Sequence, residues 1–455
     1  MSGSFLGDLL QTIADRGRDL LGMAPRDAAS GGEGLAALCE ALLSSRGEAS
    51  GVALAREVLD RWTALDEAGR GAFLSALAER FGPDAKRLRA AAEAYLADPK
   101  PGAASALHAA AESRRQELIR RLNLAPGGIG ALVRLREELL KRVPGDPALA
   151  AVDSDFAHLF ASWFNRGFLV LRRIDWTTPA NILEKIIRYE AVHEISGWDD
   201  LRRRLEPTDR RCFAFFHPRL VDEPLIFVEV ALTRGIPSAI APLLAEGREP
   251  IAATDATTAV FYSISNCQDG LRGISFGNFL IKQVVEDLRR ELPRLTHFAT
   301  LSPAPGFAAW LKRERARKKP AAPVARAADA LAVLDDPAWI DDPAKVAAAR
   351  ATLTPLAAHY FLRARSLGGR PVDPVARFHL GNGARLERLL PGADLSANGL
   401  RQSHGLMVNY LYKLDEIEAN HEAYAARGVV AASPAVRKLA PDDPAPAAEA
   451  PPVAA

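Results

Sequence analysis

The chain has 455 residues, 48% of them hydrophobic and 25% charged, and its formal net charge is +2. This length suffices for two or three domains with buried cores, and the near-neutral charge, without long basic runs, argues against a nucleic-acid-binding protein. No stretch approaches the roughly 18 apolar residues of a membrane span, and the N-terminal segment lacks the apolar core of a signal peptide. The abundance of Ala, Arg, Gly and Pro is typical of a bacterial source, so we expect a cytoplasmic protein with no nucleic-acid or membrane partner.

The first part of the chain, residues 1–165, carries hydrophobic residues at helical spacing throughout. Leu54, Val58 and Trp62, for example, lie four residues apart and would share one helix face. Glycine- and proline-rich breakers separate such segments, and one of the predicted helices is a single long one over 103–123. We therefore predict an all-helical bundle domain over 1–165.

The pattern changes near Gly167, where short runs of β-branched and aromatic residues begin to alternate with amphipathic segments. This alternation predicts an α+β, multidomain protein in which a mixed-sheet domain over 166–430 follows the helical bundle. An Ala-rich segment at about 320–370 is predicted as a helical insertion, and the Pro/Ala-rich end, 431–455, is predicted to be disordered. Strands are predicted at 168–174, 211–218, 225–233, 257–265 and 296–302, with a long helix at 276–292.

A glycine-rich turn, GISFG at 273–277, follows the fourth predicted strand. It matches G-x-S-x-G, the nucleophile elbow of α/β-hydrolases, but an elbow needs its serine at the apex of a tight strand-to-helix turn. Here the polar run NCQDGLR separates Ser275 from the strand, which argues against a nucleophile.

The same turn, preceded by a strand and followed by an amphipathic helix, resembles the acyl-CoA loop of GNAT acetyltransferases. Arg272 would hold the first position of that loop and Gly277 the sixth. Unsatisfied N–H groups at a helix N-terminus carry positive potential and bind phosphate groups. The residues expected to bind the CoA part of a ligand are Arg272, Gly273, Ile274, Ser275, Phe276, Gly277 and Asn278.

Several longer motifs occur in an order that is similar to the malonyl-CoA decarboxylase family, over most of residues 1–430. They are FNRGFLVLRRIDWTTPANILEKI (164–186), FYSISNCQDGLRGISFG (261–277), LSPAPGF (301–307), FHLGNGA (378–384) and GLMVNYLYKLDEIEAN (405–420). The resemblance implies a helical N-terminal domain used for self-association, as a dimer or tetramer, and a GNAT-like catalytic domain. It also implies conversion of malonyl-CoA to acetyl-CoA and carbon dioxide.

The resemblance assigns three catalytic positions. Ser302 is expected to be a proton acceptor that contacts the malonyl carboxylate, His379 the proton donor, and Tyr412 a residue close to the pair. Animal members carry an acidic residue at the position of Ser275, so the role of that residue does not transfer to this chain. From the residues alone, Ser302 could bond its own turn, His379 could be a core histidine, and Tyr412 a half-buried strand aromatic.

The implied chemistry needs no metal or organic cofactor. Loss of carbon dioxide from a malonyl thioester leaves an enolate whose electrons the thioester carbonyl accepts, so the protein has to stabilise an oxyanion and deliver a proton. The three cysteines, Cys39, Cys212 and Cys267, are too far apart in sequence to form a metal-binding motif, and they suit a reducing compartment.

Two other functions remain open. An acyl-CoA-binding loop serves acyltransferases as well as decarboxylases, because a fold alone does not determine the chemistry. A GNAT-type acyl-CoA-dependent acyltransferase is therefore the alternative enzyme. A non-enzymatic protein that senses acyl-CoA through the turn and interacts through the helical domain is the second alternative.

Overall fold

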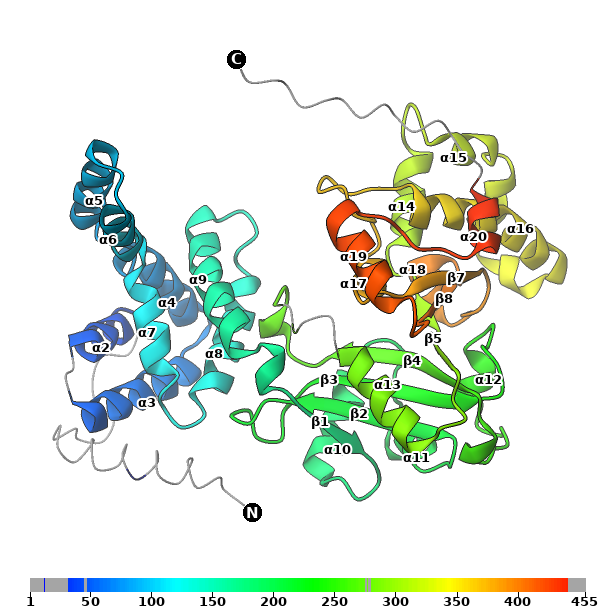
Figure 1. Cartoon of the computed structure of the whole chain (residues 1–455), viewed down its shortest axis with the longest axis horizontal. Coiled ribbons are helices and arrows are strands. Elements are labelled where there is room, and N and C mark those ends of the chain that lie inside the picture. The colour runs from blue at the N-terminus through cyan, green and yellow to red at the C-terminus, as the bar shows by residue number, and fades with distance from the viewer. Residues whose placement is uncertain (1–11, 13–31, 45–46, 275, 277–279, 441–455) are drawn as a thin grey trace. The chain divides into compact units, whose positions relative to one another are not determined.

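A computed structural model describes residues 12, 32–44, 47–274, 276 and 280–440 of the chain (Figure 1). The chain forms two compact units, each of which is described by itself. The first unit comprises Met1–Val170, Phe216–Leu225 and Cys267–Gly277, and the second comprises Leu171–Phe215, Ile226–Asn266 and Asn278–Ala455.

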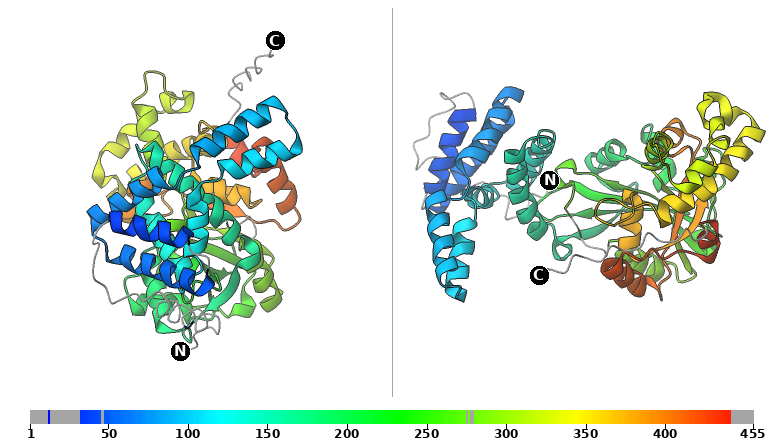
Figure 2. Two further views of the ribbon diagram at one scale, coloured as in Figure 1. Left: turned by 90° about the vertical axis from the view of Figure 1, so that its left-hand side faces the viewer. Right: turned by 90° about the horizontal axis from the view of Figure 1, so that it is seen from above.

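The N-terminal region is helical, as predicted, and α3 (Glu48–Ala64) buries the face expected from its hydrophobic spacing, whereas α5 (Ala85–Ala97) has no buried residue. In α3, Leu54, Val58 and Trp62 are all buried, and the Trp62 ring packs on Phe73 of α4 with 5.5 Å between ring centroids. Helices α5 and α6 form a hairpin, side by side in every view (Figures 1 and 2). The helices are α2 (Gly32–Ser44), α3 (Glu48–Ala64), α4 (Glu67–Arg80), α5 (Ala85–Ala97), α6 (Pro101–Ala111), α7 (Arg114–Leu122), α8 (Gly128–Leu140) and α9 (Pro147–Trp163).

The single helix predicted over 103–123 is wrong, because the chain breaks between α6 and α7. Glu112 and Ser113 are extended, with ψ angles of 126° and 145°. The Ser113 hydroxyl donates a hydrogen bond to Asp155 Oδ2 at 2.7 Å, and Arg115 Nε donates to the same oxygen at 2.8 Å. This buried contact with α9 competes with helix continuation, and local propensity does not reveal it.

A mixed sheet forms the centre of the rest of the chain, which confirms the predicted fold class: a helical N-terminal region followed by a mixed-sheet domain. Its eight strands have the order β1-β2-β3-β4-β5-β8-β6, and β7 pairs with β8. β3 and β4 are antiparallel, whereas β4 and β5 are parallel and are connected through helix α13. The strands are β1 (Val170–Ile174), β2 (Arg210–Phe216), β3 (Pro224–Thr233), β4 (Thr258–Asn266), β5 (His297–Thr300), β6 (Ser302–Pro303), β7 (Arg385–Leu390) and β8 (Met407–Leu411).

The parallel pair separates partway along its length. Pairing between β4 and β5 ends at Phe261 and Thr300, although β4 continues to Asn266. The last main-chain bond between them runs from Leu301 N to Phe261 O at 3.0 Å. Ser302 is therefore the first residue after the two strands part.

Helices surround this sheet and complete the second unit, with short 3-10 turns between some of them. None of the helices that the structure describes is both long enough and apolar enough to cross a membrane. The described α-helices after β1 are α10 (Ala180–Tyr189), α11 (Trp198–Leu205), α12 (Ala241–Leu244), α13 (Leu280–Glu291), α14 (Phe307–Arg315), α15 (Ala322–Arg326), α16 (Pro343–Leu362), α17 (Pro374–Gly381), α18 (Ala397–Ser403), α19 (Ile417–Arg427) and α20 (Pro434–Leu439).

The C-terminal segment is ordered further than predicted, since disorder was expected from residue 431. Ala432 forms a β-bridge with Leu386, and the Ser433 hydroxyl donates to Glu387 O at 2.8 Å. Ser433 also caps α20, whose Val436 is buried. These tertiary contacts anchor a segment whose composition alone suggested disorder; residues 441–455 lie outside the described part of the chain.

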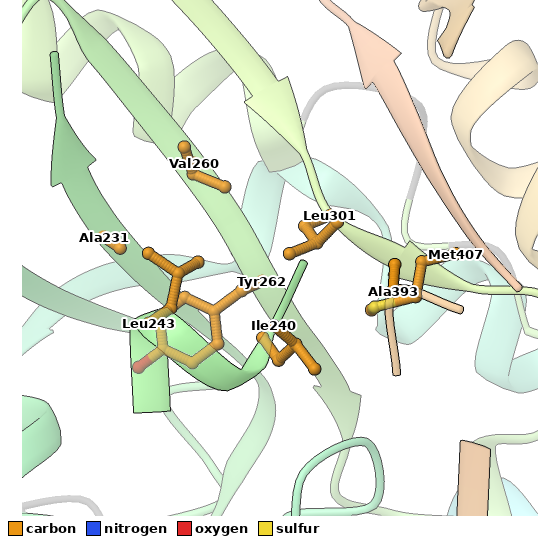
Figure 3. Close-up of a cluster of buried hydrophobic side chains, with 8 residues drawn as sticks. All are labelled: Ala231, Ile240, Leu243, Val260, Tyr262, Leu301, Ala393 and Met407. Carbon is orange, nitrogen blue, oxygen red and sulfur yellow. The ribbon is translucent and has the colours of Figure 1, made fainter. Parts of the chain in front are cut away.

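A buried apolar cluster on one face of the sheet shows which way the side chains of the neighbouring strands point. It joins Val260 of β4, Leu301 between β5 and β6, and Met407 of β8, all at most 1% exposed (Figure 3). Successive side chains of a strand point to opposite faces. Because Leu301 and Met407 point into the cluster, the residues next to each of them point to the other side of the sheet.

Candidate active site

Three side chains predicted from distant motifs meet on that other face. Ser302 Oγ lies 3.1 Å from His379 Nε2, and His379 Nδ1 lies 2.8 Å from the Tyr412 hydroxyl. Their exposed fractions are 6%, 2% and 1%. The structure thus brings Ser302, His379 and Tyr412 together as one buried, hydrogen-bonded chain.

Strand alternation explains how Ser302 and Tyr412 come to face the same side. Leu301 points into the apolar cluster, so Ser302 points away from it. Tyr412 follows directly after β8 and is five residues from Met407, which also belongs to the cluster, so it too points to the opposite face. Its main-chain N–H donates to Phe298 O of β5 at 2.8 Å.

His379 comes from helix α17, and the start of that helix is firmly held. Pro374 occupies the first turn, and the Asp373 carboxylate caps the helix by accepting the Ala376 N–H at 2.8 Å. The Tyr360 hydroxyl donates to Asp373 at 3.1 Å. Asp373 is fully buried, and burial raises its pKa to about 6. These contacts fix the turn from which the imidazole reaches Ser302.

The imidazole of His379 is enclosed by protein. Burial lowers the pKa of His379 to about 3, because desolvation disfavours the charged form. A neutral imidazole carries one N–H, so the two ring nitrogens divide the roles of donor and acceptor between Ser302 and Tyr412.

Sequence reasoning missed a further polar residue of the site, Thr300. Its Oγ1 accepts a hydrogen bond from Ser302 Oγ at 2.9 Å and another from the Tyr410 main-chain N–H at 3.2 Å. Thr300 is fully buried. The signal was present in the sequence, since Thr300 and Ser302 are two residues apart and a strand places such residues on one face.

The glycine turn is only partly described. Arg272 is exposed and pairs with Asp269 at 3.0 Å, whereas Ile274 is 9% exposed and Phe276 is half-buried. Gly273 has a φ of +80°, a conformation that non-glycine residues rarely adopt. Ser275, Gly277 and Asn278 lie outside the described residues, so CoA binding by this turn stays a prediction.

The site is built from hydroxyl, imidazole and phenol groups. Among the residues that the structure describes, no three His, Cys, Asp or Glu side chains are arranged to hold a metal ion. A hydroxyl next to a buried imidazole can bind a carboxylate and exchange a proton with a bound molecule. Such an arrangement suits acid–base chemistry.

Comparison with known protein families gives two consecutive matches. Residues 81–164 match the malonyl-CoA decarboxylase N-terminal domain, and residues 167–450 match the malonyl-CoA decarboxylase C-terminal domain. The second match alone covers more than half of the chain and contains Ser302, His379 and Tyr412.

Individual relatives agree with these matches. The mitochondrial malonyl-CoA decarboxylase of Mus musculus is 34% identical over 409 residues, which cover 81% of each chain. The crystal structure of malonyl-CoA decarboxylase from Rhodopseudomonas palustris is 64% identical, with a TM-score of 0.87 over 90% of this chain and 100% of that one. The enzyme from Cupriavidus metallidurans is 38% identical, with a TM-score of 0.70 over 90% and 99% of the two chains. The chain therefore belongs to the malonyl-CoA decarboxylase family.

Proposed function

We propose that the protein converts malonyl-CoA to acetyl-CoA and carbon dioxide, with Ser302 and His379 as its catalytic residues. The observation that supports this most directly is the buried chain Ser302–His379–Tyr412 in a member of a decarboxylase family. Its groups match the needs of the reaction: a donor for a carboxylate and a group that can hold a proton next to the reacting carbon.

The bond that breaks joins the malonyl α-carbon to its carboxylate. The electron pair of that bond moves into the thioester, whose carbonyl oxygen takes the negative charge of the enolate, and carbon dioxide leaves. One proton is then added to the α-carbon to give acetyl-CoA. The thioester itself accepts the electrons, so the protein has to orient the carboxylate, stabilise the oxyanion of the enolate and supply this proton.

In the proposed mechanism the Ser302 hydroxyl hydrogen-bonds the malonyl carboxylate, and His379 protonates the α-carbon. The substrate brings a negative charge next to an imidazole that is otherwise neutral, and a nearby negative charge raises the pKa of an imidazole. His379 would therefore take up a proton as malonyl-CoA binds and release it to the enolate. The Tyr412 hydroxyl, hydrogen-bonded to Nδ1, holds the ring with Nε2 toward Ser302.

The glycine turn is proposed to bind the phosphates of CoA. Gly273 N–H donates to no described residue, and there is open space where a side chain at Gly273 would lie. A main-chain N–H beside open space can donate to a phosphate oxygen. Arg272, exposed at the same turn, would add positive charge.

The decisive test supplies purified protein with malonyl-CoA as the only substrate. We expect equal amounts of acetyl-CoA and carbon dioxide, and a loss of roughly 10²-fold or more in kcat for Ser302→Ala. If no carbon dioxide forms, and malonyl transfer appears once an acceptor amine is added, the protein is an acyltransferase instead. If Ser302→Ala turns over normally, the role assigned to Ser302 is wrong.

A further inference from the structure

The glycine turn belongs to the same compact unit as the helical region. The 3-10 turn Asp269–Leu271, which leads into the glycine turn, lies in this unit too and packs directly on α8. The fit is close: a Cβ atom at Gly270 would lie 1.9 Å from the carbonyl oxygen of Val133. Only glycine allows the turn to approach the helix backbone this closely, so α8 is part of the support of the turn.

One buried side chain of α8 binds two carbonyl groups of the segment that leads into the glycine turn. Arg136 Nη1 donates to Gly270 O at 2.7 Å and to Arg272 O at 3.0 Å. Its Nε donates to Asp153 Oδ1 of α9 at 2.7 Å, and the Arg136 side chain is 3% exposed. The guanidinium fork is rigid and always charged, so these bonds fix the orientation of the peptide groups that they reach.

The orientation of one peptide group has a direct consequence for ligand binding. In a trans peptide the C=O of one residue and the N–H of the next point in opposite directions. Because Arg136 binds the C=O of Arg272, the N–H of Gly273 points away from Arg136. That N–H donates to no described residue, and a Cβ atom at Gly273 would have no described neighbour within 4 Å.

We propose that Arg136, in the helical region, is a positioning residue for the CoA phosphates: it orients the peptide between Arg272 and Gly273 so that its N–H faces an anionic ligand. This inference rests on the proposed function, since it takes the turn as the phosphate site. It gives the helical region a part in substrate affinity, distinct from self-association. Arg136 touches no reacting atom, so its removal should weaken binding of the phosphate-bearing end and leave the chemical step unchanged.

The experiment compares two substrates that share the same thioester, malonyl-CoA and malonyl-pantetheine, the latter without phosphates. For Arg136→Lys we expect KM for malonyl-CoA to rise about tenfold with kcat within twofold of wild type, and the KM for malonyl-pantetheine to stay unchanged. Lys keeps the charge opposite Asp153, which favours folding, but lacks the planar guanidinium whose Nε binds Asp153 while Nη1 binds both carbonyls. Arg136→Gln should show the same selectivity with a larger effect.

Arg134→Lys is the matched control, because Arg134 is exposed on the same helix. It should change neither KM nor kcat for either substrate. Calorimetric titration with CoA decides the same question without turnover: we expect about tenfold weaker affinity for Arg136→Lys and unchanged affinity for Arg134→Lys. Equal losses on both substrates, or unchanged CoA affinity, would overturn the inference. If the wild type binds CoA but forms no carbon dioxide, the proposed function fails, and the calorimetry still decides the role of Arg136.

Discussion

Thr300 accepts the main-chain N–H of Tyr410 through its side chain, in place of a ladder hydrogen bond. The register of the neighbouring pairs, Ala299 with Leu411 and Ser302 with Val408, sets Thr300 opposite Tyr410. A regular antiparallel ladder would direct the Tyr410 N–H to the Thr300 carbonyl. Instead it reaches Thr300 Oγ1, and the carbonyl accepts from the Asn409 side chain at 2.8 Å. The opening of the ladder thus places the Thr300 hydroxyl next to Ser302.

Thr300→Val and Thr300→Ser separate the role of this hydroxyl from that of its size. Valine has nearly the same shape but leaves the buried Tyr410 N–H unsatisfied and removes a partner of Ser302. We expect a loss of about 1–3 kcal/mol in the free energy of unfolding and a roughly tenfold or greater drop in kcat. Serine retains the hydroxyl, so its kcat should stay within a few-fold of wild type. Chemical denaturation and steady-state assays measure both effects, and equal activity of the two variants would contradict the role.

Tyr412→Phe removes the hydroxyl that contacts His379 Nδ1 and keeps the ring. Without that partner the imidazole loses the group that selects its tautomer and orientation. We expect kcat to fall roughly tenfold, the effect of about 1.4 kcal/mol on the barrier.

Tyr262→Phe is the matched control for this substitution. Tyr262 is equally buried, within the apolar cluster of Figure 3, and its hydroxyl has no hydrogen-bond partner in the described part of the chain. Its kcat should be unchanged. A similar drop in both variants would show that Tyr412 acts through packing alone.

His379→Asn should lower kcat by roughly 10²–10⁴, the usual share of general acid–base catalysis, while CoA affinity is retained. His404→Asn is a suitable control, because His404 has a φ of 51° at the end of α18 and asparagine tolerates that left-handed conformation. Steady-state assays and calorimetry on the two variants check this. Wild-type kcat in His379→Asn would show that His379 does not donate the proton.

Much of the fold followed from local patterns, because strands β2 and β3 are buried and α13 buries an apolar face, as their sequences predicted. The break between α6 and α7 at Ser113 could not be predicted from local patterns, since it depends on Asp155, which is distant in sequence. The ordered segment around Ser433 was missed for the same reason: its partners, Leu386 and Glu387, lie in β7.

The prediction of the site residues depended on the resemblance to a family more than on composition. From the residues alone Ser302, His379 and Tyr412 each had a structural alternative, and only the fold brings them together. The neutrality of His379 could not be predicted, because it results from complete enclosure by other elements. Thr300 was open to prediction from strand alternation, but its main-chain contact depends on the gap in the ladder.

The pKa of His379 predicts how its burial affects stability as a function of pH. An unfolded histidine titrates near 6.5, whereas His379 in the folded protein has a pKa lowered to about 3. Between these values the unfolded chain binds a proton that the folded protein does not, so stability rises with pH. The contribution is complete above about pH 6.5 and is lost as the pH falls toward 3, at up to about 1.4 kcal/mol per pH unit.

His379→Asn removes this titration while retaining Asp373, whose pKa, raised to about 6, acts in the opposite sense. A carboxyl with a raised pKa stabilises the protein at low pH and loses that contribution as the pH rises through about 6. Wild type and variant share the contribution of Asp373, so the difference between their unfolding free energies reports the titration of His379 alone. Between pH 7.5 and 5.0, wild type should lose about 2 kcal/mol more unfolding free energy than the variant. Denaturant titrations at the two pH values measure this, and parallel losses would mean that His379 is already protonated, or open to water, in the free protein.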